Sequence, residues 1–295
     1  LCTSAVFGMA NTVLDILKRE EPTHISVAFD TSEPTQRHID FPEYKAQRDA
    51  MPEDIATQLP YIDRLLDALN IHVIRRPGYE ADDVIGTLAQ QASKEGFRVW
   101  MVTPDKDYEQ LVSDDIVIYK PGRRGSDPEI FGVKEVLGKW GIERVDQVID
   151  ILGLQGDAAD NIPGIPGIGP KTASKLLKEY DSIEGIIKNA DQLKGKQKEN
   201  VENFAEQGLL SKQLATIILD SPMTFNELEF ERKEINEKIT MIATIHQPNY
   251  IPWLGFFQKV LSSDVYVIFD DIQDNLFLTR SNPCEAPSGA HLPHC

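Results

Sequence analysis

The feature that most constrains the fold of this chain is a series of short apolar runs, each followed by acidic residues. Residues 24–29 lead directly to Asp30, and residues 98–102 lead to Asp105 and Asp107. Runs of this length, separated by helical patterns, are typical of strands in an open sheet. Because such sheets bind ligands at the carboxyl ends of their strands, we expect these acids to share one edge of the sheet.

Two further acidic groups extend the pattern. Glu80, Asp82 and Asp83 stand at the start of a helical segment, and Asp157 and Asp160 follow a later apolar stretch. Like charges in one crevice repel unless a cation compensates them. Oxygen ligands without His or Cys favour a hard ion such as Mg2+ or Mn2+. Two such ions about 4 Å apart activate a water and stabilise the departing oxygen of a phosphodiester, which accounts for the number of acids.

A glycine-rich motif over residues 161–173 is the second signal. Gly164, Gly167 and Gly169 permit a tight turn, and Pro170 suits the first position of the helix that follows. A helix N-terminus of this kind holds a phosphate without reading a base. Lys171 and Lys175 add positive charge in the first turns. A plain turn between two helices is the competing interpretation.

The remaining periodicities predict the order of the elements. We expect a helix through residues 13–18, a polar segment over 33–52, helices over 53–69 and 81–94, and strands over 71–75 and 116–119. Residues 134–204 show helical periods only, and residues 216–219 could return to the sheet as an edge strand. Residues 123–127 are expected to be a linker. This order predicts an α/β fold with a mostly parallel sheet flanked by helices.

Together the motifs resemble the 5′ nuclease domain at the front of bacterial DNA polymerase I, a member of the flap endonuclease family. The resemblance covers residues 1–238 and rests on residues 27–30, 34–38, 44–48, 78–83, 103–107 and 156–173. It implies a PIN-like α/β domain over residues 1–125 and a helix-hairpin-helix lobe over residues 126–238. It also implies a structure-specific 5′-3′ exonuclease or flap endonuclease, which hydrolyses DNA by two-metal-ion catalysis in Okazaki-fragment processing and repair.

The resemblance assigns roles residue by residue. The first Mg2+ or Mn2+ ion falls to Asp30, Glu80 and Asp82. The second falls to Asp82, Asp105, Asp107 and Asp160, with Asp83 and Asp157 close by. Arg37, Lys45 and Arg48 match the family's helical arch, where Lys45 and Arg48 would reach the scissile phosphate; a solvated helix face is the competing interpretation. The DNA contacts would be Gly164, Ile165, Gly167, Ile168, Gly169, Lys171, Thr172 and Lys175, with K+ as a further candidate ion there.

The two ends depart from the family pattern. Its opening strand, which ends in Asp-Gly and supplies a ligand of the first metal, is not matched, so we expect weak cleavage or none. Residues 241–273 resemble the start of a WbqC-like protein, and the rest of 239–295 matches neither family. We expect the segment beyond residue 240 not to complete the nuclease core. Cys284, His291, His294 and Cys295 fit no usual zinc spacing.

Composition limits the remaining choices. The chain carries 47 Asp plus Glu against 30 Lys plus Arg, so any one acidic group alone could be a surface loop. Three cysteines argue against a disulfide framework, and no apolar stretch suits a membrane span. We expect a cytoplasmic monomer, without the polymerase domain, acting on DNA with 5′ flaps, nicks or branched ends.

Two alternatives from other classes remain open. The first is a catalytically inactive protein that binds branched DNA. The second is an aspartyl-phosphate phosphatase with its nucleophile in Asp105-x-Asp107, which would leave the glycine-rich motif unexplained.

Overall fold

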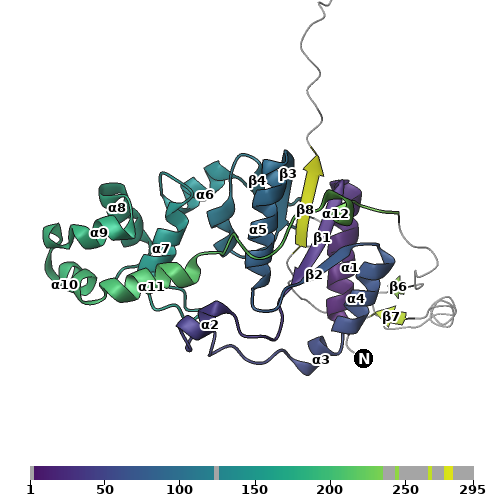
Figure 1. Ribbon diagram of the computed structural model, residues 1–295, viewed down its shortest axis with the longest axis horizontal. Coiled ribbons are helices and arrows are strands. Elements are labelled where there is room, and N and C mark those ends of the chain that lie inside the picture. Colours follow the sequence, from purple (N-terminus) through teal and green to yellow (C-terminus); the bar gives the residue numbers. More distant parts are fainter. Residues whose placement is uncertain (1–2, 123–125, 235–242, 246–264, 268–275, 282–295) are drawn as a thin grey trace, which may run out of the picture.

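A six-stranded sheet with helices on both faces joins a helical lobe in this protein (Figure 1). The computed structural model describes residues 3–122, 126–234, 243–245, 265–267 and 276–281. Within these ranges, no helix is long and apolar enough to cross a membrane. The expected α/β architecture with a helical lobe is confirmed.

The sheet has the strand order β2 (His72–Arg75), β1 (His24–Phe29), β8 (Leu276–Ser281), β3 (Phe97–Val102), β4 (Ile116–Lys120) and β5 (Glu129–Phe131). β1 pairs in parallel with β2, and β3 pairs in parallel with β4, whereas β8 and β5 run antiparallel to their neighbours. Leu276 of β8 is in register with both Val27 and Val102. The carboxyl ends of β1 and β3 therefore meet at the same edge, where Asp30 and Asp105 follow.

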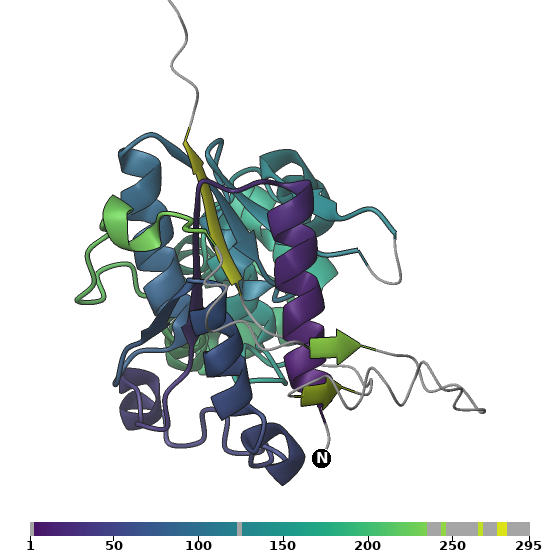
Figure 2. The ribbon, with the colours of Figure 1, turned by 90° about the vertical axis from the view of Figure 1, so that its right-hand side faces the viewer.

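Both faces of the sheet are covered, which explains why its strands read as continuous apolar runs. Val27 packs with α1 (Ser4–Arg19) and α4 (Leu59–Ala68), while its neighbour Ala28 packs on the other side with α5 (Ala81–Lys94). Figure 2 shows the purple α1 and the blue α5 on opposite sides of the yellow β8. This alternation follows from the two-residue period of a strand.

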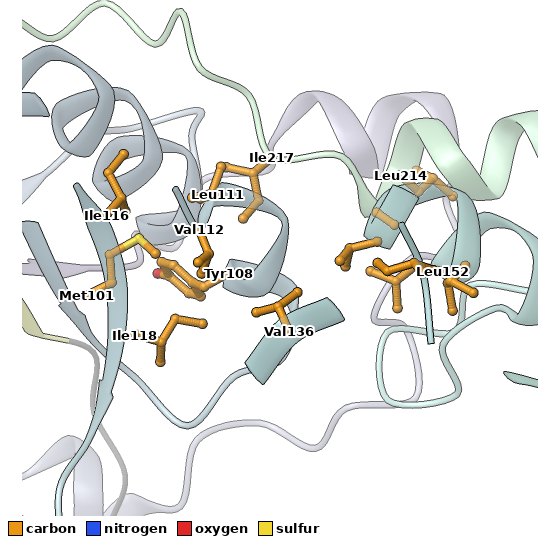
Figure 3. Packing of buried hydrophobic residues seen from close by; sticks show 14 of the residues in the cluster. Met101, Tyr108, Leu111, Val112, Ile116, Ile118, Val136, Leu152, Leu214 and Ile217 are labelled. Carbon is orange, nitrogen blue, oxygen red and sulfur yellow. The ribbon is translucent and has the colours of Figure 1, made fainter. Parts of the chain in front are cut away.

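The helical lobe is built from α6 (Val133–Trp140), α7 (Gln147–Gln155), α8 (Pro170–Tyr180), α9 (Ile183–Lys188), α10 (Gly195–Asn203) and α11 (Ala205–Ala215). Its core is continuous with that of the sheet. Figure 3 shows the buried cluster extending from Met101 and Tyr108, beside the sheet, to Leu152 and Leu214 in the lobe. The acids of the sheet edge and those of the lobe are therefore held by one packed interior.

Several local expectations need correction. Residues 53–69 form two helices, α3 (Glu53–Ala56) and α4, and Pro60 stands in the first turn of the second. Residues 216–219 are not a strand, because side chains satisfy their backbone: Ile217 N–H donates to Gln110 Oε1 and Ile218 N–H donates to Asp83 Oδ1. β5, α12 (Glu227–Phe230) and the 3-10 helices η1 (Asp107–Leu111) and η2 (Ala190–Gln192) were not expected. Residues 123–125 of the expected linker fall outside the described ranges.

The expectation that the segment beyond residue 240 does not complete the nuclease core was wrong. β8 lies between β1 and β3; it pairs with β3 over its whole length and with β1 from Leu276 to Thr279. The physical reason is that two parallel strands separated by one strand width present unpaired N–H and C=O groups that an extended segment can satisfy. β6 (Ala243–Ile245) and β7 (Val265–Val267) form a separate parallel pair. The four Cys and His residues named above fall outside the described ranges.

Candidate functional site

The sheet-edge acids are gathered around the start of α5. Asp30 Oδ1 accepts a hydrogen bond of 2.7 Å from the N–H of Ala81, in the first turn of that helix. Glu80 is its N-cap residue and Asp82 lies in the same turn. Asp105 and Asp107 follow β3, and Asp105 Oδ1 accepts the Asp107 N–H at 3.0 Å. The ends of β1 and β3 and the start of α5 thus bring three of the four acidic groups to one place.

The fourth group arrives from the lobe on a tight turn. Asp157 and Ile162 exchange backbone hydrogen bonds of 2.8 Å, which closes the turn that carries Asp160. The hydroxyl of Tyr44 lies 3.2 Å from Glu80 Oε2 and 3.3 Å from Asp160 Oδ2. One phenol oxygen therefore contacts an acid of the sheet and an acid of the lobe. The charges of Asp105, Asp157 and Asp160 all act on Asp107, so the sheet acids and the lobe acids form one cluster.

The clustering raises the pKa values of two carboxyl groups. Burial, followed by the charge of Asp105, raises the pKa of Asp82 to about 7, although a hydrogen bond from Tyr108 opposes the shift. Burial, followed by the charges of Asp105 and Asp157, raises the pKa of Asp107 to about 8. Such shifts are common where buried carboxyl groups gather at a functional site.

Three basic side chains reach into the cluster. Lys45 Nζ lies 2.8 Å from Glu80 Oε2 and 3.8 Å from Asp160 Oδ2, and Arg48 pairs with the other oxygen of Asp160. Lys106 Nζ lies 2.7 Å from Asp157 Oδ2. The segment that carries Lys45 and Arg48, residues 33–52, is called the arch segment below. It is also held through its backbone, because the Lys45 N–H donates to the carbonyl of Asp160 at 3.0 Å. Lys45 thus contacts acids of both the sheet edge and the lobe, and Arg48 contacts the lobe acid.

The donor set fits a hard divalent ion. Glu80 Oε1 and Asp107 Oδ1 are buried and have no hydrogen-bond partner among the described residues, so each is an acceptor without a donor. Among the described residues, no three His, Cys, Asp or Glu side chains are grouped so that they could hold a metal ion as they stand. Several carboxylate oxygens instead contact ammonium or guanidinium groups. An entering ion would therefore exchange with Lys45, Arg48 or Lys106 for these oxygens.

Arg37 and Asp83 do not lie as the sequence pattern suggested. Arg37 is 6% exposed, and its Nη1 and Nη2 donate to the two oxygens of Asp83 at 2.8 and 2.7 Å. Arg37 also donates to the carbonyls of Leu214 and Thr216. Asp83 also accepts a hydrogen bond from the Glu80 N–H, so it lies beside the cluster with its carboxylate engaged by Arg37. In this arrangement the pair ties the arch segment to α5 and to the end of α11.

The glycine-rich hairpin also divides into buried and exposed parts. The side chains of Ile165 and Ile168 belong to the lobe core, and the Gly164 N–H donates to Ser211 Oγ at 3.0 Å. These three residues shape the turn, and their side chains or N–H groups are engaged within the lobe. Thr172 is half-buried. The residues that remain exposed at the start of α8 are Gly167, Gly169, Lys171 and Lys175.

Two tyrosines of the site were missed from the sequence. Tyr44 bridges Glu80 and Asp160, and Tyr108 donates to Asp82 Oδ1 at 2.7 Å. The available signal was position alone, because Tyr44 precedes Lys45 and Tyr108 directly follows Asp107. A buried tyrosine needs a partner for its hydroxyl, and a neighbouring carboxylate is the natural one.

Comparison with known proteins identifies the family. The model of the 5′-3′ exonuclease N-terminal resolvase-like domain matches residues 1–141, and that of the 5′-3′ exonuclease C-terminal SAM fold matches residues 143–238. The WbqC-like protein family matches residues 247–280. DNA polymerase I of Bacillus subtilis is 43% identical over 237 residues, which are 80% of this chain and 27% of that protein. DNA polymerase I of Bacillus caldotenax is 39% identical over 286 residues, which are 95% of this chain and 32% of that protein.

The chain thus spans about a third or less of the length of these relatives. Solved structures show the same fold. A flap endonuclease of bacteriophage T5, solved with DNA and metal ions, has a TM-score of 0.60 at 22% identity and covers 71% of this chain and 79% of its own. The catalytic core of Rad2 with a DNA substrate has a TM-score of 0.52 at 15% identity, and the match covers 80% of this chain and 76% of that one. Residues 1–238 of this chain therefore belong to the 5′-3′ exonuclease family.

Proposed function

We propose that this chain hydrolyses DNA phosphodiesters near 5′ ends and at 5′ flaps, with two Mg2+ or Mn2+ ions as cofactors. The observation that carries the proposal is the meeting of sheet and lobe acids, Glu80 and Asp160, beneath Lys45 and Arg48. Acids alone could hold ions for many purposes. Acids combined with basic side chains at hydrogen-bond distance suit the charge of a phosphodiester in hydrolysis.

The residues divide into two ligand groups in this proposal. Asp30, Glu80 and Asp82 would hold one ion, while Asp105, Asp107 and Asp160 would hold the other with Asp82 between them. The ions would supply an activated water and charge stabilisation at the leaving oxygen. Ions held by these carboxylates would leave Lys45 and Arg48 available to the scissile phosphate. Asp157 remains beside the second group through its contact with Lys106.

The lobe supplies the duplex contact in this proposal. Gly167 and Gly169 bring the backbone close to a phosphate, and Lys171 and Lys175 add charge at the start of α8. Such contacts carry no base specificity, which suits a nuclease that recognises nicks, flaps and branched ends. We propose residues 1–125 as the catalytic part, residues 126–238 as the DNA-binding part, and K+ as a candidate ion at the hairpin.

The direct test is cleavage of a 5′-flap DNA in Mg2+ or Mn2+, with EDTA as the blank. We expect slow cleavage by the parent chain, and loss of that cleavage in Asp105→Ala and Asp160→Ala. The matched control is Asp114→Ala, which removes an exposed acid in a turn before β4 and should leave the rate unchanged. Cleavage that persists in Asp105→Ala would contradict the proposed site.

A second candidate is a DNA-binding protein without catalysis. The observation in its favour is that Lys45, Arg48 and Lys106 already pair with Glu80, Asp160 and Asp157. If these pairs outcompete divalent ions, the chain binds flap DNA in the presence or absence of EDTA and never cleaves it. The family assignment removes the support for the phosphatase alternative.

A further inference from the structure

Tyr108 makes a contact that the proposed chemistry has not used. It lies on η1, directly after Asp107, and its side chain is fully buried. Its hydroxyl donates to Asp82 Oδ1 at 2.7 Å. Asp82 is the acid that stands between the two proposed ligand groups, so a contact that fixes it acts on both.

The ring of Tyr108 has little freedom to move. Figure 3 shows it among Met101, Ile118 and Val136 in the buried cluster. A side chain packed to this density keeps one rotamer, and its hydroxyl therefore has one position relative to the sheet. The position of Asp82 Oδ1 is fixed in turn, and with it the direction in which Oδ2 points.

The helix that carries Tyr108 is itself held from several sides. Glu109 is buried and accepts hydrogen bonds of 2.6 Å from Lys139 Nζ and Trp140 Nε1 of α6. Gln110 donates to the carbonyl of Ala215 at 2.9 Å. Three successive side chains of η1 thus bind α5, α6 and the end of α11. This short helix is a fixed support from which the hydroxyl reaches Asp82.

We propose that Tyr108 is a positioning residue for the metal ligand Asp82. It holds the Asp82 carboxylate in the orientation an ion needs, and it sets the distance between Asp82 and Asp107, the residue that precedes Tyr108. The inference rests on the proposed function. Hydrogen-bond partners behind metal ligands commonly change metal affinity by about 10- to 100-fold when removed.

The test is Mn2+ binding by calorimetry to the whole chain and to its Tyr108→Phe variant. The change removes one oxygen and keeps the ring, and we expect Mn2+ to bind about tenfold more weakly. The matched control is Tyr119→Phe. Tyr119 is equally buried, but its hydroxyl contacts Glu20 at 3.2 Å, next to the end of α1 and on the other face of the sheet. Its loss should leave Mn2+ affinity within about twofold of the parent.

If the two hydroxyls only support the fold, both Phe variants should lose stability and Mn2+ affinity to a similar extent. Thermal unfolding of each variant is therefore measured in EDTA, beside Mn2+ binding. In cleavage assays, we expect Tyr108→Phe to raise the Mn2+ concentration for half-maximal rate about tenfold while the rate at saturating Mn2+ changes less. An Asp82→Ala background provides a second check. There Tyr108→Phe should change Mn2+ affinity no further, because its partner is already gone.

The outcomes separate the two levels of the argument. If the parent chain binds Mn2+ and Tyr108→Phe binds it equally well, the positioning role is overturned and the metal site stands. An additional loss from Tyr108→Phe in the Asp82→Ala background would also overturn it. If the parent chain binds no Mn2+ at all, the proposed function fails together with the inference.

Discussion

Replacing Arg37 with methionine tests whether this arginine supports the fold or acts on DNA. The change leaves Asp83, which is 0% exposed, without the two guanidinium hydrogen bonds of 2.8 and 2.7 Å. The backbone N–H groups of Glu80 and Ile218 would be its remaining partners. Breaking a buried ion pair from one side costs about 3–5 kcal/mol. At about 2–4 °C per kcal/mol for a domain of this size, Tm should fall by about 6–20 °C.

The assay is thermal and urea unfolding of a four-member mutant cycle. Arg37→Met/Asp83→Leu should recover part of the loss, because no unpaired charge is left in the interior. Recovery stays incomplete, since the N–H groups of Glu80 and Ile218 then lack an acceptor, at about 1–3 kcal/mol each. The matched control is Arg75→Met, whose 2.6 Å pair with Asp63 is 40% and 45% exposed. Its loss should cost less than about 1 kcal/mol.

One result would refute this reasoning. If Arg37→Met changes the free energy of unfolding by less than about 1 kcal/mol while flap cleavage falls strongly, then Arg37 acts on the phosphate, as the sequence pattern suggested. Additive effects of the Arg37 and Asp83 changes would also contradict the paired geometry.

Three further predictions follow from the site and the hairpin. The folded state raises the pKa of Asp82 to about 7 and that of Asp107 to about 8. The stability of the metal-free protein should therefore fall as pH rises from about 4 to 8, and the increase in Tm caused by Mg2+ should grow over the same range. A Tm in EDTA that does not change with pH would contradict this prediction. Gly164→Ala should lower the free energy of unfolding, measured in urea, by more than about 1–2 kcal/mol, because φ is +63° and the new Cβ would lie 2.3 Å from the Gly156 nitrogen. Gly169→Ala is the control and should lower it less, since nothing lies within 4 Å of its new Cβ. Lys171→Ala should weaken DNA binding for all sequences alike and lower the salt dependence by about one phosphate contact; an unchanged slope of binding against salt would remove the residue from the interface.

The sequence was sufficient for the parts of the site that follow from local pattern. Asp30 and Asp105 end apolar runs, and two parallel strands must bring such residues to one edge. Gly167, Gly169 and Pro170 specify the start of α8 by their backbone preferences. These inferences need only the period of a strand and the chemistry of a turn, both of which can be read from neighbouring residues.

The parts that could not be predicted depend on partners that are distant in the chain. From its spacing alone, Arg37 is predicted to be a basic residue that contacts DNA. Its hydrogen bonds to the carbonyls of Leu214 and Thr216 join residues far apart in the sequence, and no local pattern predicts them. Tyr108 reads as one more apolar residue until Asp82 is found beneath its hydroxyl. The insertion of β8 was missed for the same reason, because its pairing depends on open backbone groups of β1 and β3 rather than on its own pattern.

The central place of β8 has a consequence for the order in which this protein is made. β1 and β3 leave the ribosome long before residues 276–281 are synthesised, and at about 5–20 residues per second the delay is on the order of ten seconds or more. During that interval the β1–β2 pair and the β3–β4–β5 group each present an open inner edge. Pairing across almost the whole chain is slow to form. The nascent protein therefore passes through a period in which chaperone capture or edge-to-edge association between copies competes with closure of its own sheet.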